Sequence, residues 1–176
     1  MTAATQSLAA IRYRSGEPVD RVLKETVDAV ARLGFRVAGC LQGKAAEDAP
    51  RCADISLENI RDGRIYALSQ PLGAGAAGCR LDPSTLAEAS GDLLAALDAE
   101  VDLLVLNRFG RGEAEGHGFR RVIEKAHDRQ VPVLTAVGEA WAGHWSAFGG
   151  GLAAELPAES GAVLEWCRAV LPAREG

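Results

Sequence analysis

The apolar run Leu103–Leu106 constrains the fold of this chain more than any other feature. It leads directly into a polar turn, Asn107–Phe119, which has glycine at 110, 112, 116 and 118. A continuous apolar run of this length is typical of a strand buried on both faces, as in the middle of a parallel sheet. In open α/β sheets, ligands bind just beyond the carboxyl ends of such strands. The run therefore predicts both an α/β sheet and the place of a binding site.

Length and charge narrow the function classes. With 176 residues, we expect one α/β domain over residues 8–171, preceded by a loose tail at residues 1–7. The formal net charge of −5 argues against a nucleic-acid binder. No apolar run approaches the roughly 18 residues of a membrane span. The four cysteines lack metal-site spacing, so we predict reduced thiols, no metal site and a cytoplasmic location: Cys40, Cys52, Cys79 and Cys167.

The first forty residues predict a βαβ unit. Leu8–Tyr13 is a plausible strand, and apolar residues then recur at helical spacing from Val19 to Leu33. Gly34 stands where a helix commonly ends, and Phe35–Leu41 is a second strand. Strand, helix and strand in this order form a parallel pair by default.

An antiparallel insertion follows a polar loop at residues 42–51. Residues 53–60 and 64–69 each alternate with period two around Arg61-Asp62-Gly63, which predicts a β-hairpin at the sheet edge. Residues 70–81 are rich in glycine and alanine and predict a loop. Asp82-Pro83 then predicts the start of a helix that ends near Asp98.

The remaining segments continue the α/β rhythm. We predict a helix over residues 116–129, a buried strand over 131–137, a short strand over 152–156 and a helix over 159–171. Trp141, Trp145 and Phe148 lie on one face of a short helix that Gly149–Gly151 ends. This stripe is read as core, with a partner-facing patch as the alternative.

The first loop stands where a phosphate-binding loop belongs, after the first strand and before a helix. A working loop needs two glycines and a lysine in the pattern G-x-x-x-x-G-K-[ST]. Residues 13–20 contain one glycine, no lysine and two acids. The helix N-terminus still offers unpaired N–H groups to an anion, with contacts from Arg14, Ser15 and Gly16. An ordinary strand–helix turn is the alternative.

A second glycine-rich segment, Gly73-x-Gly75-x-x-Gly78, matches the letters of a dinucleotide fingerprint. It follows a hairpin strand and the next helix starts only near Pro83, which is the wrong context for that fingerprint. It predicts either a loop that closes over a ligand, with Cys79 and Arg80 at its end, or a surface loop.

The turn after Leu106 supplies the other candidate residues. A nucleotide hydrolase would carry a magnesium-binding acid at the end of this strand, where this chain has Asn107 and Arg108. With Gly110 and His117 they are candidate ligand contacts. Glu113 and Glu115 are the candidate general bases, although glutamate in a first helical turn also complements the helix dipole.

Several segments together resemble an uncharacterised bacterial family of unknown function, distantly similar to P-loop nucleoside triphosphatases, with members labelled molybdenum-transporter ATP-binding proteins. The segments that carry the resemblance are 19–41, the hairpin ending in Ser69-Gln70, 75–83, 102–110, 113–116 and 131–137. The resemblance implies a three-layer, P-loop-NTPase-like α/β sandwich with a mostly parallel sheet and an inserted antiparallel hairpin. The departures at residues 13–20 and at Asn107 separate this chain from active hydrolases.

Three functional hypotheses follow. The leading one is a protein that binds a small anionic ligand, a nucleotide or an oxyanion, between residues 14–16, 73–80 and 107–117, without efficient hydrolysis and accessory to molybdenum metabolism. The second is a slow nucleoside triphosphatase or other hydrolase that uses Glu113 or Glu115. The third is an interaction protein that acts as a homodimer through the Trp141/Trp145 face.

Overall fold

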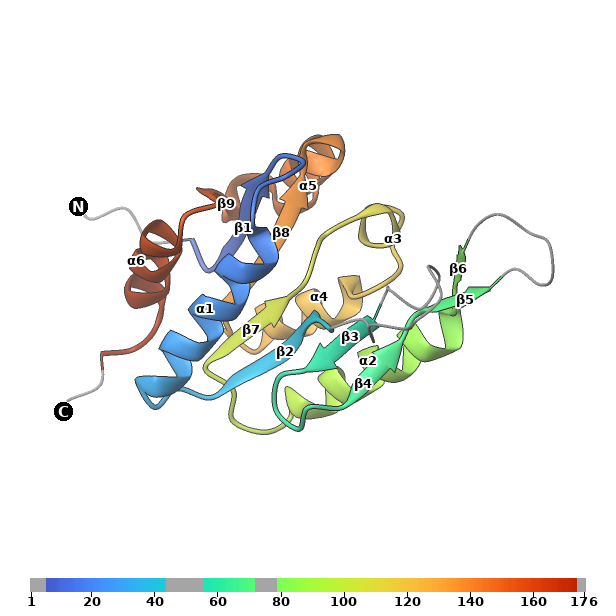
Figure 1. Cartoon of the computed structure of the whole chain (residues 1–176). Coiled ribbons are helices and arrows are strands. Elements are labelled where there is room, and N and C mark those ends of the chain that lie inside the picture. Colours follow the sequence, from blue (N-terminus) through green and yellow to red (C-terminus); the bar gives the residue numbers. More distant parts are fainter. Residues whose placement is uncertain (1–5, 44–55, 72–78, 174–176) are drawn as a thin grey trace.

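A seven-stranded sheet forms the middle of the molecule in the computed structural model, which describes residues 6–43, 56–71 and 79–173 (Figure 1). Five strands are parallel, and β3 and β4 extend one edge as an antiparallel hairpin. In spatial order the strands are β4 Ile65–Ala67, β3 Ser56–Asn59, β2 Val37–Gln42, β7 Leu103–Leu106, β8 Val133–Gly138, β1 Leu8–Tyr13 and β9 Ala153–Pro157.

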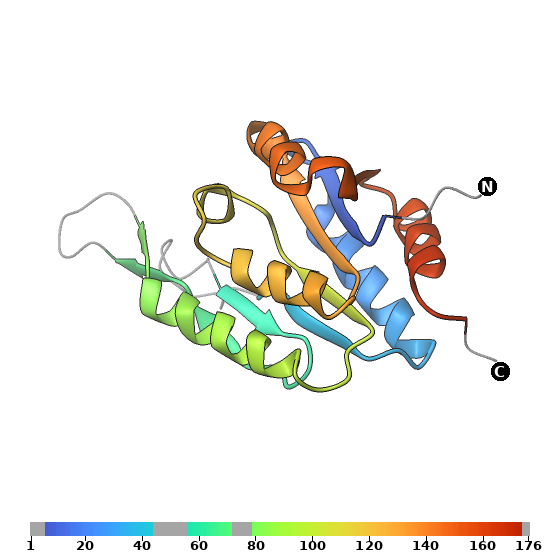
Figure 2. The same ribbon diagram turned by 180° about the vertical axis from the view of Figure 1, so that it is seen from behind.

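Helices cover both faces of this sheet. On one face, α1 Val19–Arg32 packs beside α6 Ser160–Val170. The opposite face carries α2 Pro83–Ala96, α4 Arg120–Asp128 and α5 Ala142–Gly149 (Figure 2). This arrangement is the predicted three-layer α/β sandwich with its inserted hairpin. The shorter elements are α3 Arg111–Ala114, η2 Glu139–Trp141, η3 Gly150–Leu152 and a ribbon of β5 Ser69–Pro71 with β6 Cys79–Leu81.

Strand β7 lies in the interior, as its apolar run predicts. All four residues are at most 1% exposed, with Leu104 and Leu106 facing the α2 layer and Leu103 and Val105 facing the α1 layer. Strand β2 approaches β7 closely at Gly39, which has φ +135°. A Cβ at Gly39 would overlap the backbone carbonyl of Val105, so only glycine fits this contact.

The starts of α1 and α2 differ in a way that affects binding. Asp82 caps α2 and accepts hydrogen bonds from the backbone N–H groups of Ser84 and Thr85. Pro18 precedes α1, and no side chain among the described residues caps its first turn. The first N–H groups of a helix lack partners within the helix. The start of α1 therefore keeps donors that α2 has already used.

Most predicted elements are confirmed, with local corrections. The helix expected from residue 116 begins at Arg120, because glycines 116 and 118 both have positive φ and belong to a turn. The short helix α3 was not predicted. The ends of the expected loop at 70–81 pair as β5 and β6, and residues 44–55 and 72–78 lie outside the described residues. In the part that the structure describes, no helix has the length and apolarity to cross a membrane.

Candidate functional site

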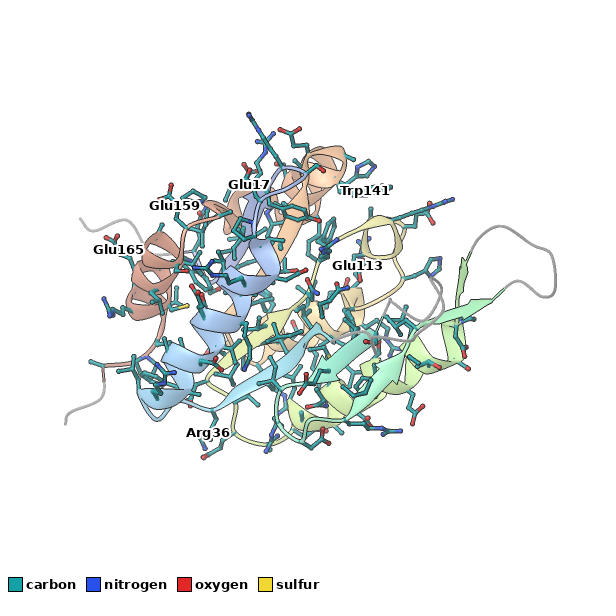
Figure 3. The ribbon with its side chains drawn as sticks, in the orientation of Figure 1. Glu17, Arg36, Glu113, Trp141, Glu159 and Glu165 are labelled. Atoms are coloured by element: carbon teal, nitrogen blue, oxygen red, sulfur yellow. The ribbon has the colours of Figure 1, made fainter. Side chains whose placement is uncertain are left out.

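The candidate site lies at the carboxyl edge of the sheet, between β1 and β8. The chain leaves β1 toward α1 on one face, and it leaves the neighbouring β8 toward α5 on the other face. Loops that diverge in this way open a crevice where α/β proteins bind ligands. Figure 3 shows Glu17, Glu113 and Trp141 at this edge of the sheet and Arg36 at the opposite edge.

We call the opening at this point the arginine crevice. It has a volume of about 600 Å³ and is lined by residues 13–21, Arg108 and residues 138–141. Three arginines and three carboxylates line it: Arg14, Arg21, Arg108, Glu17, Asp20 and Glu139. Arg14 pairs with Glu139 at 3.0 Å, and both side chains are more than half exposed. Gly16 is exposed and has φ +90°, and none of the described atoms lies within 4 Å of a Cβ added there.

Arg108 occupies an unusual backbone position at the end of β7. Its φ is +73°, in the left-handed region that few residues other than glycine adopt. The residues on either side hold it there: the Asn107 N–H donates to the Cys40 carbonyl at 3.0 Å, and the Phe109 N–H donates to the Ala136 carbonyl at 2.7 Å. Two neighbouring strands thus fix a conformation that would cost about 1–3 kcal/mol.

The aromatic stripe packs against Phe109 and thereby helps to hold the backbone at Arg108 in its left-handed conformation. The Phe109 ring packs edge-on against Trp145 at 5.3 Å and lies 5.4 Å from Phe148. Trp145 has no exposed surface, so the stripe belongs to the core at this residue. A buried aromatic cluster of this kind resists displacement of Phe109, and it therefore also fixes the residue before it.

The Arg108 side chain reaches from β7 into the crevice. Its guanidinium donates to Asp20 Oδ2 at 3.3 Å and lies 5.4 Å from the centre of the Tyr13 ring. The Arg108 and Asp20 side chains are 45% and 44% exposed. Exposed pairs of this kind contribute about 0–1 kcal/mol, so an entering anion can separate them at small cost.

A second cavity, the α1 groove, lies beside α1 on the outer part of the sheet. It measures about 290 Å³, and one face of α1 forms its wall from Asp20 to Ala31. Strands β2 and β3 and the residue after β7 form the opposite wall. The lining residues are Asp20, Leu23, Lys24, Val27, Asp28, Ala31, Leu41, Gln42, Glu58, Asn59, Ile60 and Asn107.

A third cavity, the β7 cavity, lies on the α2 side of the same strand end. It measures about 350 Å³ and includes Asn107, Arg108, Gly110 and Glu113. Glu113 is 8% exposed, and its two carboxylate oxygens accept the N–H groups of Gly110 at 3.0 Å and Phe119 at 3.1 Å. Glu113 therefore holds the loop after β7. Glu115 pairs with Arg111 at 2.9 Å on the surface.

Three buried polar atoms around these cavities have no hydrogen-bond partner among the described residues: Asp20 Oδ1, Asn107 Oδ1 and Ser56 Oγ. Asn107 is 7% exposed, and its Nδ2 donates to Gln42 Oε1 at 3.2 Å, which leaves its Oδ1 as an acceptor. A buried polar atom without a partner costs about 1–3 kcal/mol. Such atoms are usually paired in native proteins, and beside a cavity the partner is a water or a bound ligand.

The structure brings together part of the predicted site. Residues 14–16 share the arginine crevice with Arg108, and Asn107, Arg108 and Gly110 share the β7 cavity. His117 is exposed and lines none of the three cavities. Gly73, Gly75 and Gly78 lie outside the described residues, and Cys79 and Arg80 stand in β6 with side chains that are not described.

Sequence reasoning missed Asp20, Gln42 and Ser56. Asp20 is one of the two acids that count against a phosphate-binding loop at residues 13–20, and it lies in the first turn of α1. Gln42 and Ser56 are joined to the site by strand pairing, for which the local sequence has no signal.

Within the described residues, no group of three histidine, cysteine or acidic side chains could hold a metal ion. Burial raises the pKa of the free thiols Cys40 and Cys167 to about 12.

Comparison with known proteins places the chain in a family. The model of the family described as "Protein of unknown function (DUF2478)" matches residues 8–166, and the chain belongs to this family. It is 34% identical over 161 residues to the Molybdenum import ATP-binding protein ModC 2 of Bradyrhizobium diazoefficiens. The match covers 92% of this chain and 18% of that protein, so the chain spans less than a fifth of its relative. No solved structure matches the chain.

Proposed function

We propose that this DUF2478 member binds a small anionic ligand, a nucleotide or an oxyanion, on a P-loop-type scaffold whose first loop lacks lysine. The ligand occupies the arginine crevice, with Arg108 as its main cationic contact and Arg14 as the second. The start of α1 adds backbone N–H groups and the positive end of the helix dipole.

The position of Arg108 is the observation on which this proposal rests. Its left-handed backbone is held by β2, β8 and the aromatic cluster, and its side chain enters the crevice at the switch between β1 and β8. Backbone strain that the surrounding structure maintains is concentrated at ligand sites. The exposed pairs Arg108–Asp20 and Arg14–Glu139 supply cations that an anion can recruit without breaking a buried interaction.

Binding without efficient hydrolysis fits the residues around the crevice. The first loop has no lysine to reach a phosphate, and a neutral side chain, Asn107, follows β7 in place of an acid. Glu113 already accepts two backbone N–H groups and Glu115 already pairs with Arg111. The hypothesis that either glutamate acts as a base stays a prediction. Molybdate joins the candidate ligands because the Bradyrhizobium relative is named for molybdenum import.

Thermal unfolding with and without ligand tests the proposal. Inorganic phosphate, sulfate, molybdate, ATP and GTP are each titrated, and at least one raises the melting temperature of the native protein. Stabilisation reaches about 4 kcal/mol at a thousandfold excess over Kd. Arg108→Ala and Arg14→Ala reduce the shift, whereas Arg129→Ala, which loses a surface pair with Asp98, preserves it. Absence of a shift with all five ligands overturns the proposal.

A further inference from the structure

We propose that the α1 groove binds the base of a nucleotide and selects a base with adjacent N–H donors, a 2-amino-6-oxopurine such as guanine. This inference rests on the proposed function, because the arginine crevice then takes the phosphate of the same molecule. The two compartments differ in charge, lining and unpaired atoms, and each difference points to one half of a nucleotide.

Unpaired acceptors define the chemistry of the groove. Asp20 Oδ1 and Asn107 Oδ1 are buried without a partner among the described residues, and both side chains line the groove. An ionised carboxylate accepts hydrogen bonds and donates none, and the amide oxygen of asparagine is likewise an acceptor. A ligand that matches this pair must present two donors. The N1–H and 2-amino group of guanine do so on one edge.

The charge of the groove favours a neutral base over a phosphate. Asp20, Asp28 and Glu58 line it with Lys24 as the only cation among its lining residues, so these four side chains sum to −2. Lys24 pairs with Asp28 at 2.7 Å. A phosphate would meet net repulsion here. A metal ion is not the matching occupant, since no group of three potential ligands comes together among the described residues.

The walls of the groove suit a flat ring. Five of its twelve lining residues are apolar: Leu23, Val27, Ala31, Leu41 and Ile60. Its volume of about 290 Å³ is near the lower end of the range for small-molecule sites, roughly 300–1,000 Å³. Such sites combine mostly apolar walls with a few polar groups that fix orientation. Among the polar residues of the groove, Asp20 and Asn107 carry the acceptor atoms that have no partner within the described residues.

Asp20 joins the two compartments. It lines both the α1 groove and the arginine crevice, and its two carboxylate oxygens differ in their hydrogen bonding. Oδ2 accepts from Arg108 at 3.3 Å, and Oδ1 has no partner within the described structure. Arg108 and the unpaired Oδ1 therefore belong to the same carboxylate environment, so a nucleotide whose base donates to Oδ1 is long enough for its phosphate to reach Arg108. One nucleotide thereby spans both openings.

Calorimetric titration with GMP, IMP and AMP tests this inference. IMP lacks only the 2-amino group, so we expect it to bind about tenfold to a hundredfold more weakly than GMP, with AMP at least as weak as IMP. Asp20→Asn replaces one acceptor oxygen by a donor and moves the GMP-to-IMP affinity ratio toward one. Arg108→Ala weakens GMP and IMP by the same factor and leaves the ratio unchanged. Glu165→Gln removes an exposed charge on α6 and is the matched control.

The outcomes separate this inference from the proposed function. Equal affinity for GMP, IMP and AMP, with competition by inorganic phosphate, overturns the inference and leaves anion binding intact. Binding of phosphate or molybdate without binding of any nucleotide also overturns it. If neither nucleotides nor inorganic anions bind, both proposals fail. A GMP preference that survives in Asp20→Asn contradicts the assignment of the groove as the base site.

Discussion

The arginine crevice and the α1 groove lie on two sides of the first turn of α1, yet their chemistry is opposite. In the crevice, three arginines are balanced by three carboxylates, and both Arg108 and Arg14 sit in exposed, easily opened ion pairs. In the groove, acids outnumber cations and two buried oxygens lack donors. The arginine crevice therefore offers cations to a ligand, and the α1 groove offers acceptors for the N–H groups of a ligand. A single residue, Asp20, lines both openings.

The two regions also share a support. Arg108 is held from β2 and β8, and Asn107 beside it contacts Gln42 at the end of β2. Side chains in the crevice can exchange partners at small cost, because their ion pairs are exposed. The backbone that aims them is rigid, because β7 is buried on both faces. The strand ends therefore hold the site in a fixed backbone geometry, and the exposed side chains adapt to the ligand.

The largest expected effect comes from breaking the shared support. Gly39→Ala places a methyl group on the Val105 carbonyl at a positive φ, which we expect to lower the free energy of unfolding by about 2–5 kcal/mol. Urea denaturation measures this change, and ligand binding in both compartments declines with it. The control is Gly161→Ala on α6, where no atom of the described residues lies within 4 Å of the added Cβ and a helix former replaces glycine. Wild-type stability of Gly39→Ala contradicts the shared support.

Arg108→Ala removes the main cation of the arginine crevice and so distinguishes binding in the crevice from binding in the α1 groove. Arg108→Ala lowers the affinity for inorganic phosphate about tenfold to a hundredfold, because a hydrogen bond to a charged group contributes about 1.5–3 kcal/mol. Raised salt weakens phosphate binding to the native protein further, since the crevice is open to solvent. Titration calorimetry at two salt concentrations measures both effects. Phosphate affinity that is unchanged in Arg108→Ala would assign the anion to another part of the edge.

Arg108→Gly sharpens the claim that the backbone at this residue is strained for function. Glycine adopts φ +73° without the Cβ conflict, so we expect stability to rise by about 1 kcal/mol relative to Arg108→Ala. Phosphate affinity stays as low as in Arg108→Ala. Paired unfolding and binding curves check both expectations. Equal stability of the alanine and glycine variants would show that the left-handed position stores no strain.

The smallest effect concerns the capped start of α2, in contrast with the open start of α1. Hydrogen bonds from Ser84 and then Thr85 lower the pKa of Asp82 below its usual value of 3.8. A carboxylate with a lower pKa in the folded state stabilises the fold above its unfolded pKa. That contribution disappears as the pH falls below about 3.8. Asp82→Ala therefore lowers the melting temperature at pH 7 and shows a smaller difference from the native protein near pH 3. A difference that does not depend on pH contradicts the capping role.

The start of α2, the end of α1 and the hairpin turn were predictable because each depends on local chemistry. Asp82-Pro83 marks the start of α2, Gly34 with φ +88° ends α1, and Gly63 with φ +74° turns the hairpin. The turn after β7 was harder. Glycines 116 and 118 delayed α4, and Glu113 folded back onto the Gly110 and Phe119 N–H groups. Glu113, a candidate base in the sequence, holds its own loop in the structure, because backbone N–H groups nearby in the chain donate to its buried carboxylate.

The sequence by itself determined the strand β7, its polar turn and the arginine that follows Asn107. It also determined that the first loop has no lysine, which turns attention from catalysis to binding. Only the tertiary structure decided that Asp20, Asn107 and Gln42 meet, that Arg108 faces Asp20, and that two chemically opposite openings adjoin one helix turn. Local patterns are set by neighbours in the chain. The meeting of residues about 65 to 90 positions apart depends on strand order, which emerges from how the buried faces of all the elements pack together.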